Sequence, residues 1–286
     1  MAGVWSSPVR AKWLLAGAAL AAVFVLSSCS APPPTQQQRP PPSRPRIVHS
    51  ARTEPTARVT EQKPATPSAP APPEAKRGTV HRLAAYPGEI GHTASKTRIA
   101  LTLDAGASPS PTPGILQTLR DAGVHVTFFL TGKWCEQNPD LVKEIAADGH
   151  EIGNHTYSHP DLRKLDDAAI AEQLSKTEDI VVGLTGKSTK PYFRPPFGGR
   201  DKQVLGVAGE QGYTSVYWSL DSLDAYKKGI TSLEIEKRVL DRAQGGDVVL
   251  MHCGSAATAA ALPEIIAKLR ERGFEIVKVS ELASGD

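Results

Sequence analysis

The alternation of two kinds of segment from Arg98 onward constrains the fold more than any other feature of this sequence. Short apolar runs typical of strands alternate with segments that carry apolar residues at helical spacing. This order predicts an α/β fold with a parallel sheet, because parallel strands need long, usually helical, connections. The strand candidates are RIALTLD, HVTFFLTG, HEIGNH, PYFRPPF, TSVYWSLD, DVVLMH and FEIVKVS. Seven such strands favour a distorted or incomplete (β/α) barrel, with an open doubly wound sheet as the alternative.

Several helix ends can be read between these strands. Asn138 followed by Pro139 predicts the start of a helix, and Gly149 its end. Asp166 is expected to cap the helix that runs through AAIAEQLSKTEDIVVGL. Two further helices are predicted in TSLEIEKRVLDRAQGG and LPEIIAKLRERGF, where apolar residues recur at helical spacing before a glycine.

The beginning of the chain has the composition of an export signal. Residues 1–29 carry two basic residues, a short apolar stretch that ends at Leu26, and then Ser27-Ser28-Cys29. The apolar stretch is too short and too rich in alanine to favour a spanning helix, so it predicts a secretory signal. Leu26 to Cys29 resembles the lipobox of bacterial lipoproteins, which implies cleavage before Cys29 and lipid attachment to its thiol. An ordinary signal peptide is the alternative.

Residues 30–95 predict a disordered, proline-rich tether. They include APPPTQQQRPPPSRP and KPATPSAPAPPEAKR, which offer few large apolar side chains to offset the entropy cost of ordering the chain. The catalytic domain is therefore expected at residues 96–286. The net charge of the 286-residue chain is +3, without a concentrated basic arm, so nucleic acid is not an expected partner.

Polar residues gather where the predicted strands end. The carboxyl ends of parallel strands meet at one edge of a sheet and form the active site of such folds. Two acids and two histidines end apolar strands, and a further histidine and an arginine lie close by in sequence: Asp104, Asp221, His155, His252, His159 and Arg194. This placement predicts a site at that edge.

The chemistry of these residues favours hydrolysis assisted by a metal. His155 and His159, four residues apart, can meet one divalent cation, with Asp104 or water beside them. Asp104 is expected to act as general base, held ionised and oriented by Arg194. His252 is a candidate proton donor to a leaving group.

The acidic sequence SLDSLDA can supply the partner of His252. Asp221 or Asp224 could raise the pKa of this imidazole enough to keep it protonated near neutral pH. A core histidine bonded to a backbone carbonyl is the alternative for His252. Cys135 and Cys253, which the expected topology places at one end of the fold, are a possible disulfide pair in an exported protein.

Taken in order, these stretches make the chain resemble the polysaccharide deacetylase family, which has the NodB homology domain and is carbohydrate esterase family 4. The resemblance covers roughly residues 96–283. The family's first motif, T-F-D-D-G, appears as TLDAG, which implies that Asp104 is the catalytic base. The second, H-[ST]-x-x-H, is matched in full by HTYSH and implies that His155 and His159 are metal ligands.

The next two motifs line the expected substrate groove. The third, R-x-P-[FY]-G, is matched by RPPFG, which implies that Arg194 orients the base and that the Phe197 N–H is the oxyanion donor. The fourth, D-[ST]-x-D-W, appears as DSLDA. The resemblance implies that Asp221 and Asp224 tune the acid and line the pocket, but Ala225 replaces the tryptophan.

The fifth motif, L-x-H, is matched by LMH and implies that Leu250 lines the acetyl pocket and that His252 is the general acid. Two departures bear on function. Ala105 stands where the family carries its third protein ligand to the metal, which implies weaker or different metal binding. Ala225 is expected to widen the pocket on the side normally walled by the aromatic ring.

The resemblance implies a metal-dependent hydrolase that removes acetyl groups from an N-acetylated glycan. Export, anchor and tether favour peptidoglycan as the substrate, at N-acetylglucosamine or N-acetylmuramic acid. The metal is expected to be zinc, with cobalt, nickel or manganese as alternatives. We expect a monomer that is lipid-anchored on the extracellular face of the cell membrane. The rival functions are an O-acetyl esterase of the xylan type and a non-catalytic glycan-binding lipoprotein with a disabled metal site.

Overall fold

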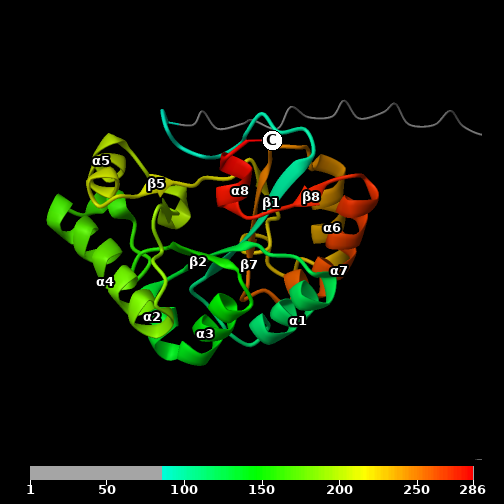
Figure 1. The fold of residues 1–286 in the computed structure, drawn as a ribbon, viewed down its shortest axis with the longest axis horizontal. Helices are drawn as coiled ribbons and strands as arrows, with labels where there is room; N and C mark the ends of the chain where they lie inside the picture. The colour runs from blue at the N-terminus through cyan, green and yellow to red at the C-terminus, as the bar shows by residue number, and fades with distance from the viewer. Residues whose placement is uncertain (1–85, 286) are drawn as a thin grey trace, which may run out of the picture. The chain divides into compact units, whose positions relative to one another are not determined.

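The computed structural model of the chain describes residues 86–285 (Figure 1). Eight strands form one sheet: β1 (Arg98–Ala105), β2 (Thr127–Leu130), β3 (Glu151–Asn154), β4 (Tyr192–Phe193), β5 (Thr214–Ser215), β6 (Leu220–Asp221), β7 (Val248–His252) and β8 (Glu275–Ile276). The order is β5-β4-β3-β2-β1-β7-β6, with β8 also paired to β1, and all of these strand pairs are parallel.

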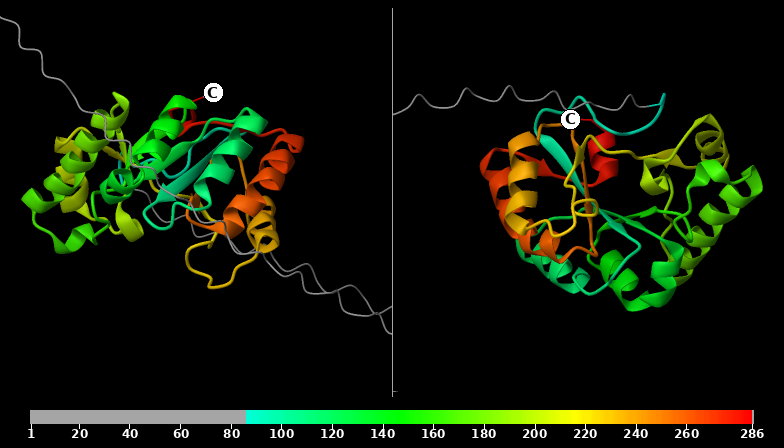
Figure 2. Two further views of the ribbon diagram at one scale, coloured as in Figure 1. Left: turned by 90° about the horizontal axis from the view of Figure 1, so that it is seen from below. Right: turned by 180° about the vertical axis from the view of Figure 1, so that it is seen from behind.

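Helices surround this curled sheet (Figures 1 and 2). They are α1 (Thr112–Ala122), α2 (Gly132–Gln137), α3 (Pro139–Ala147), α4 (Asp167–Thr185), α5 (Lys202–Glu210), α6 (Ser232–Arg242), α7 (Ala256–Glu271) and α8 (Val279–Ala283), with 3-10 turns η1 (Leu162–Lys164) and η2 (Pro196–Gly198). The predicted distorted (β/α) barrel is thus confirmed, since a parallel sheet curls within a layer of helices. No helix within residues 86–285 is both long and apolar enough to cross a membrane.

The helix boundaries follow the sequence signals closely. The Asp166 carboxylate accepts a hydrogen bond of 2.8 Å from the Ala169 N–H and caps α4, as predicted. Helix α3 begins at Pro139, and Gly149, with φ +81°, lies just beyond its end. Asn138 precedes α3, but its side chain donates to the carbonyl of Trp134 and does not cap the helix.

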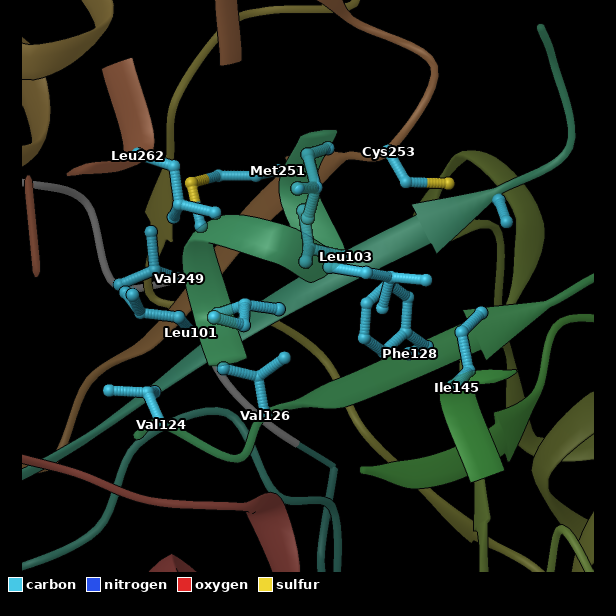
Figure 3. Packing of buried hydrophobic residues seen from close by; sticks show 14 of the residues in the cluster. Leu101, Leu103, Val124, Val126, Phe128, Ile145, Val249, Met251, Cys253 and Leu262 are labelled. Atoms are coloured by element: carbon cyan, nitrogen blue, oxygen red, sulfur yellow. The ribbon is translucent and has the colours of Figure 1, made fainter. Parts of the chain in front are cut away.

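Strand β1 separates the main core from the face that carries the site. Leu101 and Leu103 point into the main apolar cluster, where they pack with Val249 and Met251 of β7 (Figure 3). Side chains alternate along a strand, so Asp104 points to the opposite face. Both faces of β1 are buried, as expected for a central parallel strand.

The single strand predicted over residues 214–221 is wrong. The chain forms two short strands instead, β5 paired with β4 and β6 paired with β7, at opposite ends of the sheet order. Between them, the carbonyls of Val216 and Tyr217 accept hydrogen bonds from the side chain of Arg194. Because these carbonyls bond to the Arg194 side chain, the ladder of hydrogen bonds between strands is interrupted at this point.

The folded domain begins before residue 96, where the sequence placed the end of the tether. Residues 86–95 pack on the domain: Ile90 pairs with Val216, and Glu89 forms a buried ion pair with Arg200. The folded domain therefore includes at least residues 86–285. The predicted signal, the lipidated Cys29 and residues 30–85 of the predicted tether lie outside the described residues.

The possible Cys135–Cys253 disulfide is not formed. Both thiols are free and fully buried in the main apolar cluster. Cys253 follows β7, whereas Cys135 lies in α2 after β2, and β1 stands between these two strands. Two strand spacings amount to roughly 10 Å, more than the Cα separation of a disulfide. Burial raises the pKa of each thiol to about 12.

A buried histidine makes the stability of this fold sensitive to acid. The His150 ring packs against Phe128, and its Nδ1 accepts a hydrogen bond from the Val126 N–H. Burial is the main cause that lowers the pKa of His150 to about 4. Between pH 6.5 and 4 the unfolded chain therefore binds more protons at this position than the folded chain does. Stability is lost as the pH falls through this range.

We predict that lowering the pH from 7 to 5 costs the protein about 1–2 kcal/mol through His150. In His150→Gln this part of the loss should disappear, since an amide oxygen can accept the same hydrogen bond without titrating. Urea unfolding of the full chain at both pH values measures the difference. The matched control is His125→Gln, which changes an exposed neighbour. Equal losses in the wild type and His150→Gln would contradict the prediction.

Candidate active site

A cavity of about 370 Å³ opens at the carboxyl ends of the strands. Its wall brings together six of the residues predicted from the sequence: Asp104, His155, His159, Phe197, Leu250 and His252. Strand β1 delivers Asp104 and β7 delivers His252, at positions that are paired in register. The edge predicted from the strand ends is therefore where these side chains meet.

Asp104 is held by a buried arginine. Its Oδ1 lies 2.7 Å from Nη1 of Arg194, and the two side chains are 5% and 0% exposed. The same Nη1 donates to the Thr102 hydroxyl at 2.8 Å. A hydrogen bond of this length to a guanidinium fixes the direction of the carboxylate.

Arg194 is in turn held on several sides. Its Nε donates to the carbonyl of Val216 and its Nη2 to that of Tyr217. Its guanidinium lies 4.1 Å from the centre of the Phe129 ring. These contacts hold the guanidinium in one buried position, unlike an arginine in an exposed ion pair. Arg194 therefore places Asp104 at one point in the cavity.

The histidine pair lies beside this carboxylate. His155 Nδ1 is 2.8 Å from the carbonyl oxygen of Arg194, which makes Nδ1 the donor and leaves Nε2 as an acceptor. Nε2 lies 3.5 Å from Oδ2 of Asp104. Burial lowers the pKa of His155 to about 4 and also lowers that of His159. Neutral imidazoles in this tautomer are the form that binds metal.

His159 completes the pair through an unusual backbone conformation. Its φ is +60°, and its N–H donates to the Thr156 hydroxyl, so the chain curls back after β3. The two imidazole rings lie 4.8 Å apart, centre to centre. The donor set of two imidazoles with a carboxylate nearby suits a divalent ion such as zinc.

Ala105 does not add a ligand to this set. Its side chain is 1% exposed and belongs to the main apolar cluster, with Cys135 and Cys253. Within residues 86–285, no three His, Cys, Asp or Glu side chains are grouped as a metal centre. Within the described residues, His155 and His159 are the candidate ligands, and the Asp104 carboxylate lies 3.5 Å from His155.

His252 has a buried acidic partner, Asp224. Its Nδ1 lies 2.7 Å from Oδ1 of Asp224, whose other oxygen accepts from the His252 N–H and the Thr258 hydroxyl. Burial lowers the pKa of His252, but the hydrogen bond that His252 donates to Asp224 and the charges of Asp104, Asp224 and Asp221 outweigh this effect. The net effect is a pKa raised above 6.5. The imidazole is thus suited to donate a proton.

Asp221 is not among the residues that line the cavity. Its carboxylate accepts a hydrogen bond of 2.7 Å from the Leu223 N–H, where φ is +65°, and so it shapes the turn that leads to Asp224. Asp224, not Asp221, contacts His252. The two alternatives left open by the sequence are thereby distinguished, although the charge of Asp221 also favours protonation of His252.

Two aromatic residues that sequence reasoning missed line the cavity. Trp218 stacks on Tyr217 with ring centres 4.0 Å apart, and Tyr226 stands at the rim with 64% of its surface exposed. Ala225 lines the cavity too, as does the next residue, Tyr226. The side of the cavity where the motif's tryptophan is replaced by Ala225 therefore still has an aromatic ring. The tyrosine that follows Ala225 in the sequence could have indicated this.

Phe197 lies in a turn with a strained backbone. Its φ is +57°, the residue is 63% exposed, and its ring packs edge-on against that of His159 with centres 4.5 Å apart. A positive φ at a bulky residue persists only where neighbours hold it. The turn therefore presents Phe197 to the cavity in one defined conformation.

Comparison with known proteins identifies the family. The family model for polysaccharide deacetylase matches residues 91–216. A peptidoglycan-N-acetylglucosamine deacetylase of Bacillus cereus is 38% identical over 192 residues, which cover 66% of this chain and 69% of that protein. The chain belongs to the polysaccharide deacetylase family.

Other family members differ in length and in activity. Peptidoglycan-N-acetylglucosamine deacetylase PgdA of Listeria monocytogenes is 40% identical over 200 residues, 68% of this chain and 40% of PgdA. The chain thus spans about two fifths of the length of that relative. A solved structure of BA3943 from Bacillus anthracis, described as a pseudoenzyme of the family, is 30% identical with a TM-score of 0.65 and covers 69% of each chain.

We predict that Arg194→Met lowers the free energy of unfolding by about 3–5 kcal/mol, because it leaves the Asp104 carboxylate buried without its partner. Adding Asp104→Asn should recover at least about 1 kcal/mol, since the neutral amide is cheaper to bury. Urea unfolding of the full chain measures both. As a control, Arg163→Met breaks a half-exposed pair with Asp161 and should cost less than about 1 kcal/mol. Simple additivity in the double variant would disprove the coupling.

Proposed function

We propose that this chain is a hydrolase that removes acetyl groups from N-acetylated peptidoglycan. The observation that carries the proposal is the pairing of Asp104 with His252 on adjacent strands at one cavity. One side chain is a carboxylate oriented by a buried arginine, and the other is an imidazole whose pKa is raised by its bond to a buried carboxylate. This arrangement supplies a base and an acid on two sides of a bound amide.

The residues of the chain account for both proton transfers. Asp104 takes a proton from the attacking water as the water oxygen bonds to the acetyl carbon. His252 donates its proton to the amine nitrogen as the C–N bond breaks, which releases acetate and a free amino group. The Phe197 N–H is the candidate donor to the oxyanion, because its turn lines the same cavity.

His155 and His159 would hold a divalent metal, and we propose zinc, with cobalt, nickel or manganese as alternatives. When bound, such an ion supplies Lewis acidity toward the acetyl oxygen and the attacking water. The neutral state and the fixed tautomer of His155 support this assignment. With two imidazole ligands and Ala105 in the core, we expect the ion to bind less tightly than in a site with three protein ligands.

Substrate and location follow from the relatives and from the sequence. Relatives are named for both sugars of peptidoglycan, N-acetylglucosamine in Listeria and Bacillus cereus and N-acetylmuramic acid in Bacillus subtilis, which supports peptidoglycan as the substrate. We propose that the protein acts as a monomer on the outer face of the cell membrane. The lipobox at Cys29 and the proline-rich segment that follows it are the basis for this location.

A second candidate is a non-catalytic glycan-binding protein. Ala105 removes a ligand position of the family motif, and the family includes BA3943, which is described as a pseudoenzyme. A mutant of BA3943 is described as having restored enzymatic activity. The intact Asp104–Arg194 and His252–Asp224 pairs favour catalysis in the present chain.

The decisive experiment measures acetate release by the full chain from N-acetylglucosamine oligomers and from purified peptidoglycan. Release should stop after chelation and return when one metal is restored, and the metal content of the protein should rise in parallel. Acetylated xylan in the same assay tests the O-acetyl esterase. Glycan binding without release at saturating metal would support the non-catalytic function instead.

We predict that Asp104→Asn lowers kcat by at least about 100-fold, because the amide cannot accept the proton of the attacking water. Circular dichroism should show the fold retained. The matched control is Asp140→Asn, which neutralises an exposed carboxylate on α3 and should leave kcat unchanged. Full activity in Asp104→Asn would exclude this residue as the base.

We predict that the pH dependence of kcat/KM has an alkaline limb set by His252. Activity should fall as the pH rises through the raised pKa of this imidazole, because the neutral form cannot donate the proton. Asp224→Asn should move that limb to lower pH. Burial lowers the pKa of His252, and this variant removes the carboxylate that counteracts burial. Thr258→Val, which removes a neutral hydrogen bond to the same carboxylate, should move it less. An alkaline limb that stays in place in Asp224→Asn would rule out this assignment.

A further inference from the structure

A second buried ion pair lies outside the cavity and joins distant parts of the chain. Arg200 Nε lies 2.5 Å from Oε1 of Glu89, and its Nη2 lies 2.7 Å from Oε2. The two side chains are 8% and 1% exposed. The Ser215 hydroxyl also donates to Glu89, at 2.8 Å. A bidentate pair with so little exposure fixes the guanidinium in both position and orientation.

Arg200 in turn contacts the turn that presents Phe197. Its Nη1 donates to the carbonyl of Gly198 at 3.2 Å, and its guanidinium lies 3.6 Å from the centre of the Tyr217 ring. Gly198 has φ +65°, and a Cβ on it would lie 2.6 Å from Cε2 of Tyr217. The turn therefore rests on Tyr217 on one side and is bonded to Arg200 on the other.

Both contacts of Arg200 lead to the cavity wall. Phe197, next to Gly198, packs on the candidate ligand His159. Tyr217 stacks on Trp218, which lines the cavity. A shift of Arg200 would therefore displace residues in two walls of the cavity.

The segment that carries Glu89 is also bonded to the backbone behind the site. The Ile90 N–H donates to the carbonyl of Ser215 at 2.9 Å, and the Tyr217 N–H donates to the carbonyl of Ile90 at 2.7 Å. The carbonyl of Tyr217 then accepts from Arg194, the partner of Asp104. Glu89 and Ile90 lie in the segment that the sequence assigns to the tether. Their contacts therefore support both Asp104, through Arg194, and the turn at Phe197.

We propose that Glu89 is a positioning residue of the active site: through Arg200 it holds the Phe197–Gly198 turn in place. The effect on rate rests on the proposed function, since the Phe197 N–H is the candidate oxyanion donor. A displaced donor stabilises the transition state less and changes substrate binding little. Loss of the pair should therefore lower kcat more than it changes KM.

The test compares Glu89→Gln and Arg200→Lys with the wild-type full chain. We expect each to lower kcat by about tenfold or more while KM stays within about twofold. The double variant should lose no more than the worse single variant, because both act through one interaction. The matched control is Glu144→Gln, which breaks a partly exposed pair with Arg120 away from the cavity and should leave kcat unchanged. Wild-type kcat in Glu89→Gln, or a loss confined to KM, would overturn the proposal.

Hydrogen exchange gives a readout that does not depend on catalysis. In Glu89→Gln and in the milder Arg200→Lys, amide exchange should quicken in residues 197–201, while β1 and β7 stay as protected as in the wild type. Unchanged exchange at residues 197–201 in both variants would overturn the proposal, whatever the activity. If the wild type releases no acetate but exchange quickens as expected, the proposed function fails and Glu89 retains its positioning role.

Discussion

The active site depends on a buried guanidinium that must be neutralised. Arg194 is fully buried, and an arginine in that position is tolerated only when an opposite charge and several acceptors surround it. Asp104 supplies the charge from β1, and the carbonyls of Val216 and Tyr217 supply acceptors from the crossing between β5 and β6. The same contacts that satisfy the arginine orient the base. Folding and site assembly are therefore one process at this point.

The alternation of side chains along β1 explains why the sequence can change at Ala105 while Asp104 stays in place. Asp104 faces the cavity, whereas Ala105 is packed in the main apolar cluster with the two free thiols. A small apolar residue fits that cluster at no cost in desolvation, but it leaves two imidazoles as the candidate metal ligands. The Asp104–Arg194 and His252–Asp224 pairs are built by other contacts and do not depend on that position. This separation allows both pairs to persist in a chain whose candidate metal ligands differ from the family motif.

Periodicity and strand ends predicted much of this structure, because both follow from local chemistry. The burial of β1 and the Asp166 cap are properties of neighbouring residues, and the convergence of Asp104, His155 and His252 follows from parallel strands. The sequence failed where distant contacts override local pattern. The apolar run TSVYWSLD is divided into two strands because the Arg194 side chain donates hydrogen bonds to carbonyls in the middle of the run. Residues 86–95 have the composition of the tether, but they pack on the domain because Glu89 forms an ion pair with Arg200. Neither contact leaves a local signal.

The loop that carries the third motif begins and ends at a buried arginine. Arg194 precedes it and is paired with Asp104, and Arg200 follows it and is paired with Glu89. Two ion pairs with partners on different segments fix the ends of a five-residue stretch, residues 195–199, which leaves its backbone few alternatives. This restriction explains how Phe197 can hold a positive φ beside the cavity. A loop fixed in this way needs residues ahead of β1, so residues 86–95 are part of the fold that forms the cavity wall.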